Sequence, residues 1–444
     1  MTDNVPLRIA FTTLGCKVNQ SETDLLARQF TAAGYTCVPF DEPADVYVVN
    51  TCTVTHVADK KSRQLLGQAR RANPDALLVA TGCYASIVGD ALADDRTLVV
   101  RNRDKDRLAA IVQGRVQRTP AELPYFAEPG KYLDLSPGEI TPGWRARAQV
   151  KAQDGCDSHC TYCIIPRARG RSRSLPPERV IGRVRALVRE EHAEVVITGV
   201  DLGSYGEDQE SLPDLGGLLA RILEETEVRR IRVSSLEPGD FDQAWLPLWE
   251  SPRLCRHLHV PLQSGSAAVL QRMERKYAPR QFADMVAALR HAIPDVTITT
   301  DVMAGFPGET DEEFDEGYNF IREMRFDGMH VFKYSKRSGT RAARLSDQVP
   351  ETVKHERSRL LREEAQRGID RLIGRHANRV LAVVWESQSD GIWRGLTDTN
   401  VRAYGSPHGC RVGSLARARL TFPFRDGLWS ESAHAEIPLA AASS

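Results

Sequence analysis

Asp154-Gly155-Cys156-Asp157-Ser158-His159-Cys160-Thr161-Tyr162-Cys163 places three cysteines within eight residues, with the spacing C-x3-C-x2-C. This spacing lets three thiolates of one loop face a common point. A zinc site or a four-thiolate cluster needs a fourth local ligand, and Cys255 lies far away in the sequence. The loop therefore favours an iron-sulfur cluster held by three thiolates, with one iron open to a small molecule. A zinc knuckle or unrelated buried thiols are the alternatives.

The same loop continues as Cys163-Ile164-Ile165-Pro166-Arg167-Ala168-Arg169-Gly170. With the cysteine spacing, this run resembles the radical S-adenosylmethionine (SAM) enzymes, and among them the methylthiotransferases. The resemblance implies that Cys156, Cys160 and Cys163 are catalytic. They would hold a [4Fe-4S] cluster whose open iron binds the amino and carboxylate groups of SAM.

Length, charge and cysteine content limit the class of protein. A chain of 444 residues is expected to form two or three domains. Lysine plus arginine and aspartate plus glutamate both number 59, so any affinity for RNA must come from local patches. Nine cysteines argue against a disulfide framework and indicate a reducing compartment. We find no signal peptide and no apolar run of about 18 residues, and we expect a cytoplasmic protein without a membrane segment.

Residues 7–125 alternate apolar runs with amphipathic stretches, which is typical of a doubly wound α/β sheet. Ser21-Glu22-Thr23-Asp24 supplies capping side chains and acids to the first helix, and Gly34 follows its last apolar turn. The predicted strands are Arg8 to Thr13, Tyr35 to Phe40, Asp45 to Thr51, Ala76 to Thr81 and Thr97 to Arg101.

Three cysteines of this domain, Cys16, Cys52 and Cys83, each follow the C-terminal end of a predicted strand. Because these ends share one edge of a parallel sheet, the cysteines can converge, although position alone leaves coincidence open. Residues 11–23 and 50–55 match methylthiotransferase motifs closely, and this resemblance implies a second [4Fe-4S] cluster on the three cysteines. Cys37 lies inside a predicted strand and is expected to be a core residue.

Residues 126–143, which contain three Pro-Gly dipeptides, are predicted to be a linker to a second domain at 142–370. Six β/α units, the first leading directly into Cys156, predict a partial barrel with ligands at the C-terminal ends of its strands. The first strand begins near Ala146, and the others are predicted at Glu194 to Val200, Arg230 to Ser235, His257 to Leu262, Val296 to Met303 and Gly328 to Tyr334.

Several residues at these strand ends resemble family motifs and are candidate SAM contacts. The carboxylate of Asp201 suits the SAM ammonium group, and Gly199 permits close approach. The Gly305–Thr310 run is equally consistent with a turn that caps the following helix, and His259 with a hydrogen-bonded strand histidine. The full set of candidates is Gly199, Asp201, Glu237, His259, Gln263, Gly305 and Gly308.

Arginines recur at every second position beside the cysteine loop, at Arg167, Arg169, Arg171 and Arg173. In an extended conformation they would form one cationic edge at which phosphates or substrate carboxylates dock, so we treat all four as candidate substrate contacts. The alternative is a solvated loop whose arginines pair with nearby acids.

The C-terminal part begins with a charged helix from Pro350 to Arg371, which we interpret as a connector with too few apolar residues for a core role. In residues 371–444, nine arginines exceed six acids, for a net charge of +3. Residues 371–438 are predicted to form a small OB-like β-barrel that resembles the RNA-binding TRAM domain, and its aromatic residues are more often core than base-stacking platforms. The predicted strands are Arg379 to Trp385, Gly391 to Thr397 and Arg411 to Phe422.

The resemblance covers nearly the whole chain and implies that two SAM molecules serve to replace a C–H bond of a tRNA adenosine with C–S–CH3. Residues 15–20, 161–166 and 334–340 are most similar to the branch acting on N6-threonylcarbamoyladenosine at position 37. The alternatives are N6-isopentenyladenosine, an aspartate of a ribosomal protein, or an iron-sulfur RNA-binding protein without turnover. The expected partners are a tRNA anticodon loop and a flavodoxin- or ferredoxin-like reductant, and the chain is expected to be a monomer.

Overall fold

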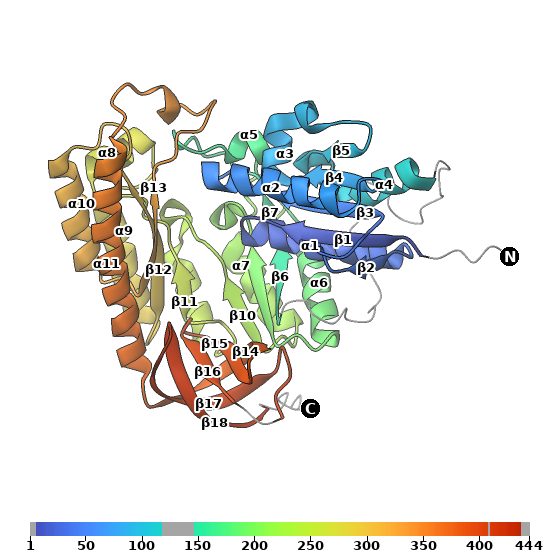
Figure 1. Cartoon of the computed structure of the whole chain (residues 1–444). Coiled ribbons are helices and arrows are strands. Elements are labelled where there is room, and N and C mark those ends of the chain that lie inside the picture. Colours follow the sequence, from blue (N-terminus) through green and yellow to red (C-terminus); the bar gives the residue numbers. More distant parts are fainter. Residues whose placement is uncertain (1–5, 118–145, 407–408, 437–444) are drawn as a thin grey trace.

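The computed structural model describes residues 6–117, 146–406 and 409–436. It is a mixed α/β structure with an N-terminal sheet, a central partial barrel and a small C-terminal barrel, as Figure 1 shows. The expected fold class is therefore confirmed. The predicted linker at 126–143 lies outside the described residues. No helix among the described residues is both long enough and apolar enough to cross a membrane.

The N-terminal sheet has five parallel strands in the order β2-β1-β3-β4-β5. The central strand β3 is buried along its whole length, because helices cover both faces. The strands are β1 (Arg8–Thr13), β2 (Thr36–Val38), β3 (Val46–Thr51), β4 (Leu77–Thr81) and β5 (Thr97–Val100). The helices are α1 (Lys17–Ala32), α2 (His56–Ala72), α3 (Gly82–Val88) and α4 (Leu108–Gln117).

The central barrel is parallel and has six main strands. Two three-stranded sheets, β6-β9-β10 and β11-β12-β13, meet through bridges such as Ser235 to His259. The strands are β6 (Arg147–Lys151), β9 (Glu194–Thr198), β10 (Arg230–Val233), β11 (His257–His259), β12 (Thr297–Ala304) and β13 (Gly328–Lys333). Helices α6 (Pro177–Arg189), α7 (Leu215–Glu225), α8 (Ala267–Met273), α9 (Pro279–Ala292) and α10 (Asp311–Met324) alternate with them.

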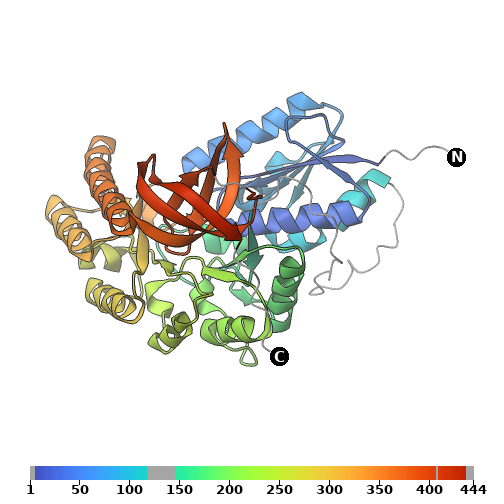
Figure 2. The ribbon, with the colours of Figure 1, turned by 90° about the horizontal axis from the view of Figure 1, so that it is seen from below.

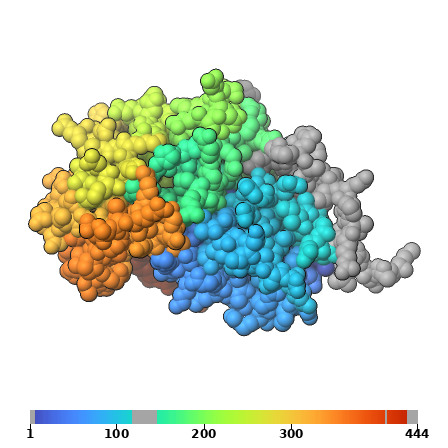
Figure 3. All heavy atoms as spheres, turned by 90° about the horizontal axis from the view of Figure 1, so that it is seen from above, coloured from blue at the N-terminus to red at the C-terminus, as the bar shows by residue number. Residues whose placement is uncertain are grey.

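Strands β6 and β13 are not paired with each other in the part of the chain that the structure describes, so the barrel is laterally incomplete. The N-terminal domain lies against the β6 side, where the Ser21 hydroxyl donates a hydrogen bond to the Gln149 carbonyl at 3.1 Å. The segment after β13 reaches the same domain, because Arg337 pairs with Asp59 at 2.7 Å. Figure 3 shows this segment in orange beside the blue N-terminal domain.

Helix α11 (Glu351–His376) ends five residues beyond the predicted end at Arg371, and the expectation that it has no core role is wrong. Leu361 joins the core of the central barrel, and Leu372 and Ile373 join that of the C-terminal barrel. Its apolar residues are few, but each lies on the face that the two barrels cover. The helix therefore connects the barrels by sharing their cores.

The C-terminal strands form a closed barrel in the order β14-β15-β16-β18-β17. The sequence missed two of these strands, and Trp385 and Tyr404 are core residues. The strands are β14 (Arg379–Ser389), β15 (Ile392–Thr397), β16 (Arg402–Gly405), β17 (Leu415–Phe424) and β18 (Gly427–Glu436).

A buried ionic contact attaches this barrel to the N-terminal ends of the central strands, across which it lies in Figure 2. Glu194 accepts from Arg232 Nε at 2.8 Å, and the two arginines Arg230 and Arg232 donate to carbonyls of β14 and β15 or their connections. Arg230 Nη2 reaches the Leu396 carbonyl at 2.7 Å, and Arg232 Nη2 reaches that of Thr397 at 2.8 Å. The C-terminal barrel thus lies at the end of the central barrel opposite the cysteine loop.

Candidate active site

The structure brings the three N-terminal cysteines together at the C-terminal edge of their sheet. Cys16 follows β1 and is the N-cap of α1, Cys52 follows β3, and Cys83 lies in the first turn of α3, after β4. These strands are direct neighbours in the sheet. The pKa of Cys52 is raised to about 11, mainly by burial, and its neighbours Cys83 and Cys16 add to the rise. The three thiols are close enough to affect one another electrostatically. They fit an iron-sulfur cluster, because bound iron converts such thiols to thiolates.

Two glycines allow these loops to approach one another. A Cβ at Gly15 would lie 2.8 Å from the Cys52 sulfur, and one at Gly82 would lie 2.3 Å from the Thr51 carbonyl oxygen. Both glycines also have positive φ, which side-chain-bearing residues rarely adopt. The loops that carry Cys16, Cys52 and Cys83 therefore depend on glycine at both positions.

We expect Gly82→Ala to lose the iron of the N-terminal site while SAM cleavage at the other site continues. The added methyl group must displace Thr51, which directly precedes Cys52. Gly34→Ala is a matched control, because Gly34 also has positive φ but no atom within 4 Å of the added Cβ. Iron analysis of both reconstituted variants checks the prediction, and full iron content in Gly82→Ala would contradict it.

The second cysteine triplet lies in the loop after β6 and β7 (Gln153–Asp154), above the end of the barrel. Its backbone is fixed from several sides: Thr161 donates to the Met273 carbonyl at 3.0 Å, and the Thr161 carbonyl accepts from Ala342 at 2.9 Å. Arg275 Nη1 donates to the Cys160 sulfur at 3.3 Å. Burial raises the pKa of Cys163 to about 12. The loop can present three sulfurs, and it needs bound iron to ionise them.

Three carboxyl groups adjoin this loop. The Cys156 thiol donates to Asp201 Oδ2 at 3.1 Å, and the carboxyl groups of Asp201 and Asp240 are hydrogen-bonded to each other. Burial raises the pKa of Asp201 and of Glu237, and burial together with the Asp201 charge raises the pKa of Asp240 to about 7. A cluster of three carboxyl groups fits a cationic ligand, and SAM carries an ammonium and a sulfonium group.

The other candidate SAM contacts lie nearby but have structural partners. A Cβ at Gly199 would lie 2.9 Å from Gln153 Oε1, which accepts from the next two backbone amides. Gly305 has positive φ, and its amide donates to Glu309 Oε2 at 2.9 Å. The Gly308 amide donates to the Asp347 carbonyl at 2.7 Å. Both glycines belong to a turn before α10, whose N-cap Thr310 accepts from the Glu313 amide at 3.2 Å.

His259 and Gln263 lie on the β11 side of the barrel. His259 Nδ1 is 3.0 Å from the Thr299 hydroxyl, and its Nε2 is 3.3 Å from Asp301 Oδ1, so both ring nitrogens have partners. Gln263 has positive φ, and its buried side-chain oxygen has no hydrogen-bond partner among the described residues. Gln263 therefore retains an acceptor for a ligand.

The expected extended conformation of the four arginines is wrong. Arg167 and Arg169 lie on the short helix α5 (Ile165–Arg169), which Pro166 starts and Gly170 ends at positive φ. Arg171 is exposed and pairs with Asp157 at 3.4 Å. Arg173, in β8 (Arg173–Ser174), lies 3.6 Å from Asp154. Only Arg167 and Arg169 share the helix, and Arg169 is buried whereas Arg171 is exposed, so the four arginines form no single cationic edge.

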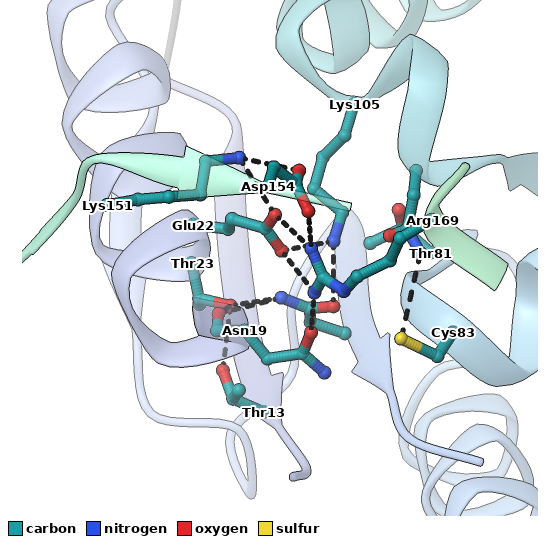
Figure 4. Close-up of polar contacts among 12 residues, drawn as sticks. Thr13, Asn19, Glu22, Thr23, Thr81, Cys83, Lys105, Lys151, Asp154 and Arg169 are labelled. Carbon is teal, nitrogen blue, oxygen red and sulfur yellow. Dashed lines mark hydrogen bonds and ion pairs between the residues drawn. The ribbon is translucent and has the colours of Figure 1, made fainter. Parts of the chain in front are cut away.

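Arg169 is instead the centre of a buried ionic network between the two cysteine-bearing domains (Figure 4). Its Nη1 donates to Glu22 Oε1 at 2.9 Å and to Asp154 Oδ1 at 2.8 Å. Lys151 bridges the same two carboxylates at 3.0 and 3.1 Å, and Lys105 donates to Glu22 Oε2 at 2.5 Å. Glu22 belongs to α1, and Asp154 lies two residues before Cys156. The network therefore fixes the N-terminal domain against the start of the cysteine loop.

Sequence reasoning missed this network, because it treated Glu22 as a helix-capping acid and Arg169 as a surface contact. The sequence does hold a signal: Glu22 lies on the same face of α1 as Val18 and Leu26, four residues away on either side. That face is the buried one. An acid on a buried helix face requires a cation from another element.

A cavity of about 670 Å³ lies between the N-terminal domain, the central barrel and the C-terminal barrel. Cys16 and Lys17 line it from the N-terminal domain, and Ser234, His257 and His330 line it from the barrel. Residues of α11 and of the C-terminal barrel close the far side. A substrate in this cavity would lie beside Cys16 of the N-terminal triplet.

Known proteins share these features. Residues 8–100 match the model of the uncharacterized protein family UPF0004, and residues 150–321 match that of the radical SAM superfamily. The radical SAM methyltransferase TsrM from Kitasatospora setae has a similar fold, with a TM-score of 0.53 at 17% identity over 74% of this chain and 75% of that one.

The chain is 39% identical to threonylcarbamoyladenosine tRNA methylthiotransferase MtaB of Bacillus subtilis over 97% of this chain and 98% of the relative. It is 36% identical to the MtaB protein of Thermotoga maritima over 91% and 94% of the two chains. It is 32% identical to tRNA-2-methylthio-N(6)-dimethylallyladenosine synthase of Geobacillus kaustophilus over 92% and 79%. With its two cysteine triplets and its partial barrel, the chain belongs to the radical SAM methylthiotransferase family.

Proposed function

We propose that this protein converts N6-threonylcarbamoyladenosine at position 37 of tRNA to its 2-methylthio derivative. The observation that carries the proposal is the pair of three-cysteine sites on two domains that a buried ionic network fixes together. The MtaB relatives match this chain at higher identity than the dimethylallyladenosine synthase does, which supports the threonylcarbamoyl substrate.

The two sites would hold two [4Fe-4S] clusters. Cys16, Cys52 and Cys83 would bind one, and Cys156, Cys160 and Cys163 the other. When bound, the clusters supply the electron for SAM cleavage and the sulfur for insertion. Such chemistry is needed because the C2–H bond of adenine is neither acidic nor electrophilic enough for side-chain acid–base catalysis.

The protein's own groups would bind and orient SAM. Asp201 is a buried carboxyl group beside Cys156, and it suits the ammonium group. Glu237 is engaged by Arg275, which also contacts the Cys160 sulfur, so this pair orients the cysteine loop. Gln263 offers a further acceptor at the end of β11.

We propose three functional domains: residues 7–125 for sulfur insertion, 142–370 for SAM cleavage and 371–438 for RNA binding. In the last of these, exposed Phe422 stacks on Trp429 with ring centroids 6.2 Å apart, which suits contact with an unpaired base. The anticodon loop would be the contact region, because its bases are not locked in a duplex. A flavodoxin- or ferredoxin-like protein would supply electrons to a monomeric, cytoplasmic enzyme.

The test is nucleoside analysis by mass spectrometry of tRNA from cells with and without the gene. We expect loss of 2-methylthio-N6-threonylcarbamoyladenosine and accumulation of its unthiolated precursor. Loss of the methylthio form of isopentenyladenosine would instead assign the other tRNA substrate, and unchanged tRNA with an unmodified ribosomal protein would assign the protein substrate. Incubation of the reconstituted chain with SAM and dithionite tests turnover, because a protein without turnover releases no 5′-deoxyadenosine.

A further inference from the structure

Two residues that line the cavity beside Cys16 each carry a buried polar atom whose hydrogen-bonding capacity is unused. Ser234 is 3% exposed and His257 is 6% exposed, and both line the cavity. Neither the Ser234 hydroxyl nor His257 Nδ1 has a hydrogen-bond partner among the residues that the structure describes. Because buried polar groups are normally paired, the two atoms indicate a place for a polar ligand.

Cations lie near His257 on this side of the cavity, and Asp301, Asp327 and Asp426 line other parts of it. Burial lowers the pKa of His257 well below its usual range, and the neighbouring cations Arg232, Lys17 and Arg147 lower it further. Glu194 pairs with Arg232 and with Arg147, at 2.8 and 3.6 Å. Lys17, by contrast, forms no hydrogen bond or ion pair within residues 6–117, 146–406 and 409–436. An anionic group that enters the cavity would therefore find an available ammonium group.

The hydrogen bonds that Thr299 makes determine whether His257 acts as a donor or as an acceptor. The Thr299 hydroxyl lies 3.0 Å from both His257 Nε2 and His259 Nδ1, and it has one proton to donate. When Thr299 donates to His257 Nε2, the neutral His257 ring carries its proton on Nδ1, the nitrogen that has no partner among the described residues. His257 is thereby suited to a carboxylate or hydroxyl oxygen.

We propose that this cavity is the subsite for the N6 substituent of the substrate adenosine, in which Lys17, Ser234 and His257 bind the carboxylate and hydroxyl of the threonyl group. This inference rests on the function proposed above. The N6 and C2 positions of adenine share the Watson–Crick edge, so the substituent must lie close to the place where C2 receives sulfur. Cys16 lines the same cavity. An apolar isopentenyl group would leave these polar groups buried and unpaired, which penalises the wrong substrate.

The test measures the dissociation constants of anticodon stem-loops that carry N6-threonylcarbamoyladenosine or its methyl ester, which lacks the carboxylate charge. We expect esterification to weaken binding to the unsubstituted protein by about tenfold to a hundredfold, the loss typical of one hydrogen bond to a charged group. In Lys17→Met, esterification should change the dissociation constant by less than about twofold, because the partner of the carboxylate is already gone.

Ser234→Ala separates recognition from a structural role. It should weaken binding of the threonylcarbamoyl stem-loop by about threefold to tenfold and leave the thermal midpoint of the free protein unchanged, because the hydroxyl has no partner to lose. Ser358→Ala is the matched control: its hydroxyl is equally buried and unpartnered, but it lies on α11 and does not line the cavity. It should change neither the affinity nor the midpoint.

Equal losses on esterification in the unsubstituted protein and in Lys17→Met would overturn the subsite, as would unchanged affinity in Ser234→Ala. A stoichiometric metal ion that is distinct from cluster iron and is lost in His330→Phe would also overturn it, because potential ligand atoms of His259, Asp301 and His330 lie within 4.8 Å of one another. These outcomes leave the proposed function intact if the reconstituted protein still methylthiolates the threonylcarbamoyl stem-loop. Failure of that conversion would overturn the function itself.

Discussion

Cys156→Ala produces no 5′-deoxyadenosine and no methylthiolated nucleoside, whereas Cys52→Ala continues to cleave SAM and loses only the methylthio product. Each triplet has three cysteines and no fourth, so the loss of one thiolate leaves a cluster with two protein ligands. The two sites belong to different domains, and the loop with Cys156 is supported by Met273 and Ala342, both of the central barrel. Damage at Cys52 should therefore leave SAM cleavage in place.

The measurements are chromatography of 5′-deoxyadenosine and mass spectrometry of digested tRNA, after anaerobic reconstitution. Cys37→Ala is the matched control, because Cys37 belongs to the same domain but lies in β2, packed against the sheet core. It should keep both activities. Loss of SAM cleavage in Cys52→Ala, with the iron of the other cluster retained, would show that the two sites do not divide the reaction in this way.

Arg169→Met lowers the free energy of unfolding by about 3 to 5 kcal/mol, the usual cost of removing one partner from a buried ion pair. Arg169 is 3% exposed and contacts both Glu22 and Asp154. Burial alone would raise the pKa of Glu22, but the charges of Arg169, Lys105 and Lys151 outweigh it and hold that pKa well below its usual range. Without Arg169, two buried carboxylates share the remaining lysines.

Urea denaturation of Arg169→Met and of the control Arg171→Met checks this prediction. Arg171 is two residues further along the chain, has a 90% exposed side chain and contacts Asp157 alone among the carboxylates of the described residues. Its replacement should change stability by less than about 0.5 kcal/mol. Equal denaturation midpoints for the two variants would contradict a role of the Arg169 network in holding the domains together.

Acidification offers a second measurement of the same network. Because the folded-state pKa of Glu22 is lowered, its contribution to stability is present above its unfolded-state pKa and is lost as the pH falls toward the folded-state value. Removal of Arg169 raises the folded-state pKa. The variant should therefore begin to lose stability at a higher pH than the unsubstituted protein, and parallel pH profiles would argue against the assignment.

The sequence predicted the ends of the strands well, and with them the positions of the N-terminal cysteines. Cys16, Cys52 and Cys83 follow β1, β3 and β4, and parallel strands carry their C-terminal ends to one edge. Alternating apolar residues mark a strand, and a glycine marks the end of a helix. Both signals involve neighbouring residues, so they can be recognised in the sequence alone. Strands β16 and β18 were missed, and the structure pairs them with each other in parallel, a contact that no local pattern of the sequence specifies.

The conformation of the arginines beside the cysteine loop, by contrast, was not predicted correctly from the sequence. Their two-residue spacing suggested one face of an extended segment, but Pro166 and Gly170 bound a helical turn that directs Arg169 into the protein. Which arginine meets Glu22 and which meets solvent depends on the placement of α1, and spacing along the chain does not specify it.

By itself, the sequence determined the ligand chemistry, the order of the three units and the family, because short-range spacing sets what one loop can bind. Only the tertiary structure decided which charged groups meet across the domains and which polar residues line the cavity beside Cys16. Both depend on how separately folded units pack together. Such packing buries ions and hydroxyls that belong to no local motif, and so it leaves no pattern in the chain that could have been recognised in advance.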